Sequence, residues 1–96
     1  MTLEPELTTK EVKELFRVIV SLRTEEECRD FLRDLCTFSE LKAMTERWQV
    51  VKRVNQKTPY RIIAEKTGAS TATITRVAHW LHHGTGGYRL ALDRIS

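Results

Sequence analysis

The apolar residues of this chain recur at helical spacing along almost its whole length, and this pattern limits the possible folds more than any other feature. Segments 25–36 and 40–55 both place apolar residues three or four positions apart. In the segment 10–22, the residues at such spacing are Val12, Leu15, Phe16, Ile19 and Val20. No pair of segments alternates with the period of two that strands require. The sequence therefore predicts an all-α chain with about six helices.

Start and stop signals divide these residues into separate helices. Three capping boxes, in which a threonine precedes a glutamate by three positions, occur at 8–11, 24–27 and 37–40. The third opens a long helix, after which Thr58 is expected to cap the next helix and Pro59 to take its first position. Gly68 ends that helix, and Ser70 or Thr71 caps a fifth. A glycine-rich turn precedes a short sixth helix.

The charge of the chain is divided unevenly between its two parts. The whole sequence of 96 residues has a formal net charge of +3. Residues 1–40 hold six bases and ten acids, a net −4, whereas residues 41–96 hold ten bases and three acids, a net +7. The basic part predicts a face that binds a polyanion, although a solvated basic surface without a partner accounts for the count equally well.

Length and composition exclude several other classes of protein. A chain of 96 residues accommodates one small domain, and no apolar run approaches the roughly 18 residues of a membrane span. The first five residues lack the apolar core of an export signal. Two cysteines, Cys28 and Cys36, agree with a reducing cytosol and, at eight positions apart on an apolar stripe, with core positions. We therefore expect a cytoplasmic protein, and no phosphate loop or nucleophile elbow indicates an enzyme.

The stretch from Tyr60 to Trp80 has the pattern of a helix-turn-helix. Such a motif needs a small residue where the two helices cross and a turn residue that tolerates positive φ, and Ala64 and Gly68 occupy these positions. Thr67 departs from the pattern, because an aliphatic residue is usual at its place. The residues predicted to pack inward are Ile63, Ala69, Ile74 and Val77. A plain helical hairpin with a glycine cap is the alternative.

With those residues inward, the outward face of the second helix and its flanks become the candidate DNA-binding surface. Short polar side chains on the N-terminal half of a recognition helix can reach base edges, and arginines near a helix start suit phosphates. The basic residues before the motif would extend the phosphate-binding rim, or would form only a solvated helix face. The candidate DNA-binding residues are Tyr60, Arg61, Ser70, Thr71, Ala72, Thr75, Arg76, Lys52, Arg53 and Lys57.

The run from Thr45 to Arg76, and above all GASTATITR at 68–76, resembles the Trp-repressor superfamily. The whole chain, including the tail GGYRLALDRI at 86–95, looks closer to its small YerC/YecD-like branch of bacterial helix-turn-helix proteins. The resemblance implies an intertwined homodimer whose two reading heads meet successive major grooves. It also implies one domain over 1–96, with dimerisation helices at 8–56, the helix-turn-helix at 58–83 and a C-terminal helix at 86–95.

The resemblance does not extend to the tryptophan corepressor of the family's namesake. Arg76 matches an arginine that helps to hold the corepressor, but Val77 stands where the repressor has a glycine and Trp80 where it has a serine. Glu46 is aligned with the second corepressor arginine, and its carboxylate would oppose that of the ligand. We therefore expect that the protein binds no free tryptophan, and that Val77 and Trp80 brace the reading head instead.

Metal binding is the one other kind of chemistry that the sequence leaves open, at three histidines near the end of the fifth helix. His79, His82 and His83 stand at i, i+3 and i+4, which is a spacing of zinc ligands, but a frayed polar helix end is the simpler interpretation. We predict no cofactor and no metal. The sequence thus predicts a DNA-binding transcriptional regulator, and the resemblance implies that it acts as a homodimer and as a repressor. An adaptor that uses the helix-turn-helix on a protein of the transcription machinery is the alternative.

Overall fold

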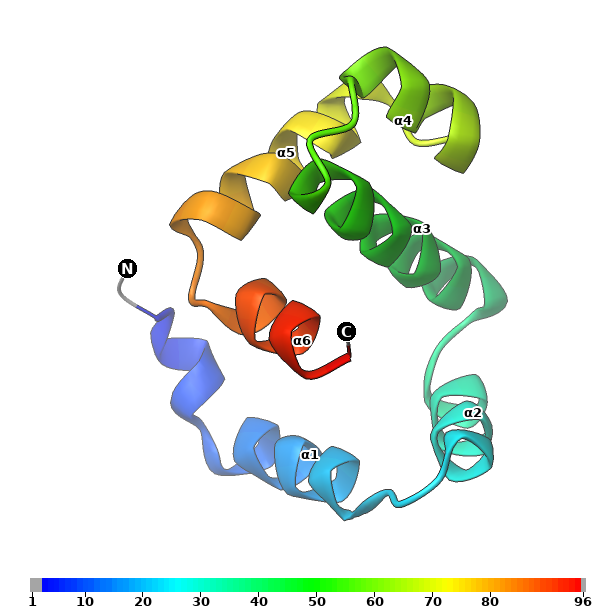
Figure 1. Ribbon diagram of the computed structural model, residues 1–96. Coiled ribbons are helices and arrows are strands. Elements are labelled where there is room, and N and C mark those ends of the chain that lie inside the picture. Colours follow the sequence, from blue (N-terminus) through cyan, green and yellow to red (C-terminus); the bar gives the residue numbers. More distant parts are fainter. Residues whose placement is uncertain (1–2, 96) are drawn as a thin grey trace. The chain divides into compact units, whose positions relative to one another are not determined.

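The structure, a computed structural model, describes residues 3–95 and shows six α-helices there, with no strand in that range. Figure 1 labels the helices along the chain. The elements are η1 (Pro5–Thr8, a 3-10 turn), α1 (Lys10–Ser21), α2 (Glu25–Leu35), α3 (Phe38–Asn55), α4 (Tyr60–Thr67), α5 (Thr71–His83) and α6 (Gly87–Ile95). The predicted all-α class is confirmed, and only the short η1 was not foreseen.

The described residues form two compact units, one up to Leu41 and the other from Lys42 onward. In the first unit, the predicted cap of α1 at Thr8 is wrong by one residue. The Thr8 hydroxyl donates to the Pro5 carbonyl oxygen at 2.7 Å, which closes the η1 turn. Thr9 therefore takes over the cap, and its hydroxyl accepts from the Val12 N–H at 3.3 Å.

The capping box of α3 forms as predicted and that of α2 forms in part, because the Glu27 carboxylate accepts from the Arg23 N–H at 2.9 Å and not from the N–H of the cap residue Thr24. The Glu27 N–H donates to Thr24 Oγ1 at 3.0 Å, so Thr24 caps α2. At the start of α3 the bonds are reciprocal: the Thr37 N–H donates to Glu40 Oε1 at 2.8 Å, and the Glu40 N–H donates to Thr37 Oγ1 at 3.1 Å. The hydrogen bonds from the Thr37 backbone and side chain lower the pKa of the Glu40 carboxyl below its ordinary value.

Neither α1 nor α2 contains a buried residue. Both helices are amphipathic, yet their apolar side chains remain accessible, and Val20 is 82% exposed. The large exposed apolar residues of this unit include Phe16, Val18, Ile19, Val20, Leu35 and Phe38. Cys28 and Cys36 are half-buried free thiols, so the expectation that they are core residues is only partly met.

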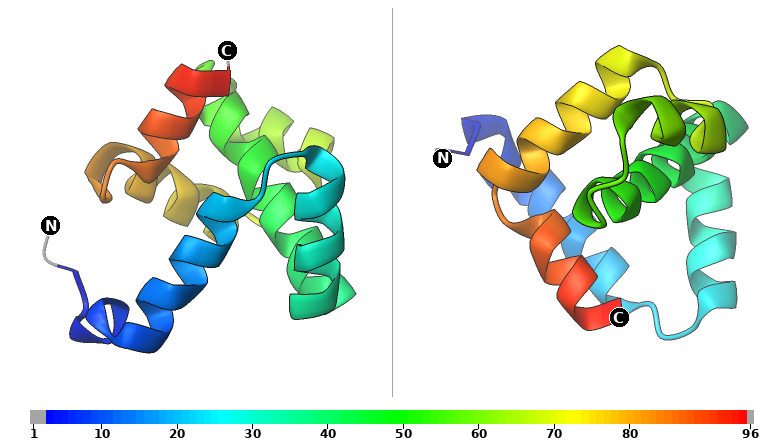
Figure 2. Two further views of the ribbon diagram at one scale, coloured as in Figure 1. Left: turned by 90° about the horizontal axis from the view of Figure 1, so that it is seen from below. Right: turned by 45° about the horizontal axis from the view of Figure 1, so that its top comes forward.

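The core of the second unit lies among α3, α4, α5 and α6, as the views of Figures 1 and 2 agree. Each helix contributes at least one fully or almost fully buried aliphatic side chain, and Trp48 of α3 packs against them from the side. A hydrogen bond from Arg89 of α6 to Asn55 Oδ1, 2.8 Å long, joins α6 to the C-terminal end of α3. The buried residues are Val50, Val51, Val54, Ile63, Ala69, Ile74, Val77, Ala78, Leu81 and Leu92.

The turn from α3 to α4 is built on Lys57, which adopts a left-handed conformation with φ +61°. The Lys57 N–H donates to the Val54 carbonyl oxygen at 2.9 Å, and the Thr58 N–H donates to the Arg53 carbonyl oxygen at 3.0 Å. These two bonds form a Schellman motif, whose left-handed position glycine usually occupies. The prediction that Thr58 caps α4 is wrong, because its backbone closes α3, and Pro59 is the N-cap without a side-chain bond.

Candidate nucleic-acid interface

The turn between α4 and α5 has the geometry that the helix-turn-helix pattern predicts. Gly68 ends α4 with φ +78° and ψ 0°, and its N–H donates to the Ala64 carbonyl oxygen at 2.9 Å. A methyl group at Gly68 would lie 3.9 Å from Glu46 Oε2, which is an ordinary contact, so the backbone conformation rather than lack of space calls for glycine. Figure 2 shows α4 and α5 meeting at this turn.

Thr67, the residue that departs from the usual pattern, replaces an aliphatic contact by two hydrogen bonds. Its hydroxyl donates to the Ile63 carbonyl oxygen at 2.7 Å and accepts from the Ala69 N–H at 3.1 Å. The Ala69 N–H is thereby satisfied just where the chain leaves α4. A half-buried threonine thus closes the turn by hydrogen bonding.

Buried anchors beneath α5 define which of its faces points outward. Ile74 is fully buried and Val77 is 2% exposed, and Ile63 and Ala69 are buried as predicted. Because an α-helix repeats every 3.6 residues, the positions between these anchors face away from the core. The structure accordingly leaves exposed Thr71, Ala72, Thr75, Arg76 and His79.

Ser70 is exposed, but its hydroxyl already has two partners. It accepts from the Thr73 N–H at 3.1 Å and donates to Thr73 Oγ1 at 3.1 Å, so it caps α5. The choice that the sequence left between Ser70 and Thr71 as the cap is thereby settled in favour of Ser70. Its hydroxyl holds the start of the helix, and the side chains of Thr71 and Ala72 are the first that project freely from it.

The candidate phosphate-binding residues lie on three neighbouring segments. Tyr60 and Arg61 begin α4 and are exposed, and the first turn of that helix contains no acid. Lys52 is exposed on the last turn of α3, and Lys57 is exposed in the turn that follows. The acid-free N-terminus of α4 suits an anion, because its free N–H groups carry a partial positive charge. The C-terminus of α3, where the two lysines lie, carries a partial negative charge, so an anion there would be attracted by the lysines and not by the helix end.

Arg53 differs from the other bases because it is half-buried. Its Nε atom is inaccessible and has no hydrogen-bond partner among the described residues. With Lys52 it lines a small hollow of about 120 Å³ that also involves Gln49 and Gln56. The sequence analysis missed these two glutamines, although positions 49, 52, 53 and 56 follow the spacing of one helix face.

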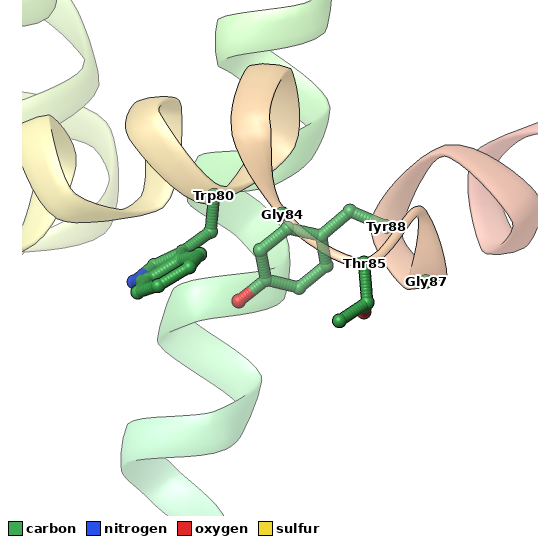
Figure 3. A pocket seen from close by; sticks show the side chains of 5 residues that line it. All are labelled: Trp80, Gly84, Thr85, Gly87 and Tyr88. Carbon is green, nitrogen blue, oxygen red and sulfur yellow. The ribbon is translucent and has the colours of Figure 1, made fainter. Parts of the chain in front are cut away.

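A second hollow, of about 420 Å³, lies at the junction of α5 and α6. Figure 3 shows the side chains of Trp80 and Tyr88 extending on the same side of the glycine-rich turn. Val77 fills the core as the sequence suggested, but Trp80 is 39% exposed and so is not a core residue of this chain. Gly84 is required at the end of α5, because a Cβ there would collide with the Trp80 carbonyl oxygen.

The three histidines of α5 are all exposed near its C-terminus. The rings of His79 and His83 lie 5.1 Å apart between centroids, whereas those of His82 and His83 are 6.4 Å apart. Over residues 3–95, no cluster of three or more histidine, cysteine or acidic side chains is arranged to hold a metal ion. Within the same residues, no helix is long and apolar enough to span a membrane.

Comparison with known proteins identifies close relatives over nearly the whole chain. The family described as Trp repressor protein matches residues 10–96. An uncharacterized protein of Bacillus subtilis (strain 168), YerC, is 43% identical over 89 residues, which are 93% of this chain and 86% of YerC. Neither finding assigns a DNA sequence or a ligand to this chain.

Two solved structures share the fold. A crystal structure of a TrpR-like protein from Eubacterium eligens has a TM-score of 0.92 and 41% identity, covering 96% of this chain and 95% of its own. A crystal structure from Staphylococcus aureus has a TM-score of 0.93 and 39% identity, covering 99% of this chain and 95% of its own. The arrangement of helices in this chain therefore recurs in bacterial relatives.

Proposed function

Because this chain belongs to the Trp repressor family, in its YerC-like branch, we propose that it is a sequence-specific DNA-binding transcriptional regulator. One observation carries the proposal: the outward face of the N-terminal half of α5 is exposed and free of acids, while Ile74 and Val77 anchor the opposite face in the core. A recognition helix enters the major groove with these N-terminal residues. Within the family it resembles, the expected sign of regulation is repression.

Direct reading of bases is assigned to three side chains. The hydroxyl groups of Thr71 and Thr75 can bond base edges or phosphates, and the Ala72 methyl group can contact a thymine methyl. Arg76 lies beside Thr75 on the same exposed face and adds a long cationic donor. Short side chains at three of these four positions permit a close approach of the helix backbone to the groove floor.

Phosphate contacts are assigned to the bases around the motif. Arg61 and Tyr60 stand at the start of α4, whose free N–H groups favour an anion. Lys52 and Lys57 extend the basic rim, and the half-buried Arg53 adjoins Lys52 on the last turn of α3. Each phosphate neutralised should steepen the salt dependence of binding.

We also propose that the functional form is a homodimer. The accessible apolar faces of α1 and α2 support this, because a monomer would leave residues such as Val20 and Leu35 in water. Burying them against a second copy would stabilise both chains. Two reading heads of such a dimer would meet half-sites one helical turn, roughly 34 Å, apart on a near-palindromic site. Sedimentation velocity at micromolar concentration measures the predicted mass directly.

Free tryptophan is not expected to be the effector. Val77 is packed into the core, which leaves its position no room for an indole, and Trp80 already places an indole beside the end of α5. The half-buried Glu46 would also repel the carboxylate of an amino acid. Isothermal titration calorimetry should detect no binding of tryptophan, and an affinity in the low micromolar range would contradict this part of the proposal.

The decisive experiment selects bound fragments from random duplex DNA and then measures their affinity by fluorescence anisotropy at several salt concentrations. Ala72→Asp should abolish preference for the selected site, because a carboxylate would face the groove floor. Ala91→Asp, at an exposed alanine of α6, is the matched control and should bind like the wild type. Intact site-specific binding by Ala72→Asp would refute the assignment of the reading helix.

Two further variants separate base reading from phosphate binding. Arg61→Ala should weaken binding to all sequences and lower the salt slope, whereas Thr75→Val should change the preferred sequence. Arg94→Ala, on exposed α6, serves as the control for removal of a positive charge. If the wild type binds no DNA even at low salt, the adaptor that contacts a protein of the transcription machinery becomes the better explanation.

A further inference from the structure

His79 and His83 lie four positions apart in α5, which brings their side chains onto one face of the helix. Both residues are exposed, and their ring centroids lie 5.1 Å apart with planes inclined by 43°. On this geometry, and against the expectation from the sequence that the chain binds no metal, we propose that this pair chelates one divalent late transition-metal ion, with water completing the coordination. Neither the family nor the DNA-binding surface assigns a metal to these residues.

The spacing of the two rings matches that of two imidazoles on one tetrahedral ion. A zinc–nitrogen bond is roughly 2.0–2.1 Å long, so an imidazole centroid lies about 3.2 Å from the bound metal. Two such rings have centroids about 5.2 Å apart at the tetrahedral angle of zinc and about 4.5 Å apart at the right angle of a tetragonal Cu²⁺ site. The His79 and His83 centroids are already 5.1 Å apart, so binding requires little change in the separation of the side chains.

The end of the helix adds an electrostatic contribution of favourable sign. The C-terminus of an α-helix carries a partial negative charge, and His83 is the last residue of α5. Arg76, two turns before His83, opposes a bound cation, so we expect a moderate rather than a tight affinity. The nitrogen donors favour Cu²⁺ over Ni²⁺ and Zn²⁺, whereas Mg²⁺ and Ca²⁺ prefer oxygen.

The site differs from a structural zinc centre in its number of protein ligands. No cluster of three or more possible ligand side chains occurs in the described part of the chain, so the metal would keep exchangeable water molecules. His82 adjoins the pair in sequence, but its ring lies 6.4 Å from that of His83. Its different position on the helix makes it the matched control for the other two histidines.

The test uses the full chain without an affinity tag, in a non-chelating buffer at pH 7.5, and titrates it with Cu²⁺, Ni²⁺, Zn²⁺ and Mg²⁺ by calorimetry. Cu²⁺ also quenches nearby indoles, and the Trp80 ring lies 5.2 Å from that of His79, so fluorescence gives a second readout. The expected result is one Cu²⁺ per chain and no binding of Mg²⁺. No DNA is present, so the result is independent of the proposed regulator function.

Substitutions identify the ligands. A second donor on one helix acts at an effective concentration near the millimolar range, so His79→Ala and His83→Ala should each weaken Cu²⁺ binding at least about tenfold. His82→Ala should leave the affinity within about twofold of the wild type. Circular dichroism of each variant checks that α5 still folds. An equal loss in all three variants, or an undiminished affinity in His79→Ala, would overturn the proposal.

Discussion

Replacing Lys57 by glycine should raise the stability of the protein and lower its affinity for DNA. Lys57 holds φ +61° at the end of α3, where two hydrogen bonds enforce the conformation. A side chain in the left-handed region costs about 1–2 kcal/mol relative to glycine. Glycine also gives the unfolded chain extra freedom, which offsets about 0.4–1 kcal/mol of that gain. The net stabilisation is therefore about 0.8 kcal/mol, within limits of about 0 and 1.6 kcal/mol.

The effect on DNA binding has the opposite sign. If Lys57 neutralises one phosphate, its removal should lower the slope of log affinity against log salt by about 0.9 for each chain. Thermal denaturation followed by circular dichroism should show a rise of about 4 °C in the midpoint. Fluorescence anisotropy with one fixed duplex at several salt concentrations measures the slope.

Two variants keep these effects apart. Lys57→Arg retains both the charge and the left-handed strain, so the stability and the salt slope should match those of the wild type. Lys52→Ala removes a neighbouring charge on regular helix, so it should lower the slope without any gain in stability. A lower midpoint in Lys57→Gly would refute the strain reasoning, and an unchanged slope would refute the phosphate contact.

Three further predictions concern the turn of the helix-turn-helix and the start of α3. Gly68→Ala should destabilise the protein by a net of about 0.8 kcal/mol, because the left-handed conformation costs alanine about 1–2 kcal/mol and the reduced freedom of the unfolded chain offsets about 0.4–1 kcal/mol. Chemical denaturation measures this, and a stabilised variant would contradict it. Thr67→Val should cost about 1 kcal/mol in the same assay, because it leaves the Ala69 N–H without its partner. Hydrogen bonds from Thr37 lower the pKa of Glu40, so the stabilisation is present above the ordinary glutamate pKa and is lost as pH falls through the lowered one. The melting temperature of the wild type should thus fall more on acidification than that of Glu40→Gln, and parallel curves would exclude this role.

Features encoded by local bonding were predictable from the sequence. The Thr37–Glu40 box and the Gly68 turn each depend on a few adjacent residues whose chemistry permits little else. Buried anchors such as Ile74 and Val77 followed from helical spacing, since a period of 3.6 fixes which side faces the core. The outward face of α5 could be deduced for the same reason.

Features that depend on competition between equivalent groups were not predictable. Thr8 and Thr9 are both good caps, and only the bond from Thr8 to Pro5 decided in favour of Thr9. The Schellman turn carries Lys57 where a pattern search expects glycine, and so it passed unnoticed. The exposure of Trp80 depends on how α6 packs after the glycine-rich turn, which no local signal specifies.

The absence of buried side chains in α1 and α2 bears on how the protein reaches its native state. Helices of 12 and 11 residues are marginal in water without packing, so these two segments need another surface to persist. If that surface is a second copy of the chain, refolding becomes second order in protein concentration. The cellular concentration of the chain would then determine what fraction of it forms dimers that can bind DNA. Newly made chains would remain susceptible to proteolysis until they dimerise.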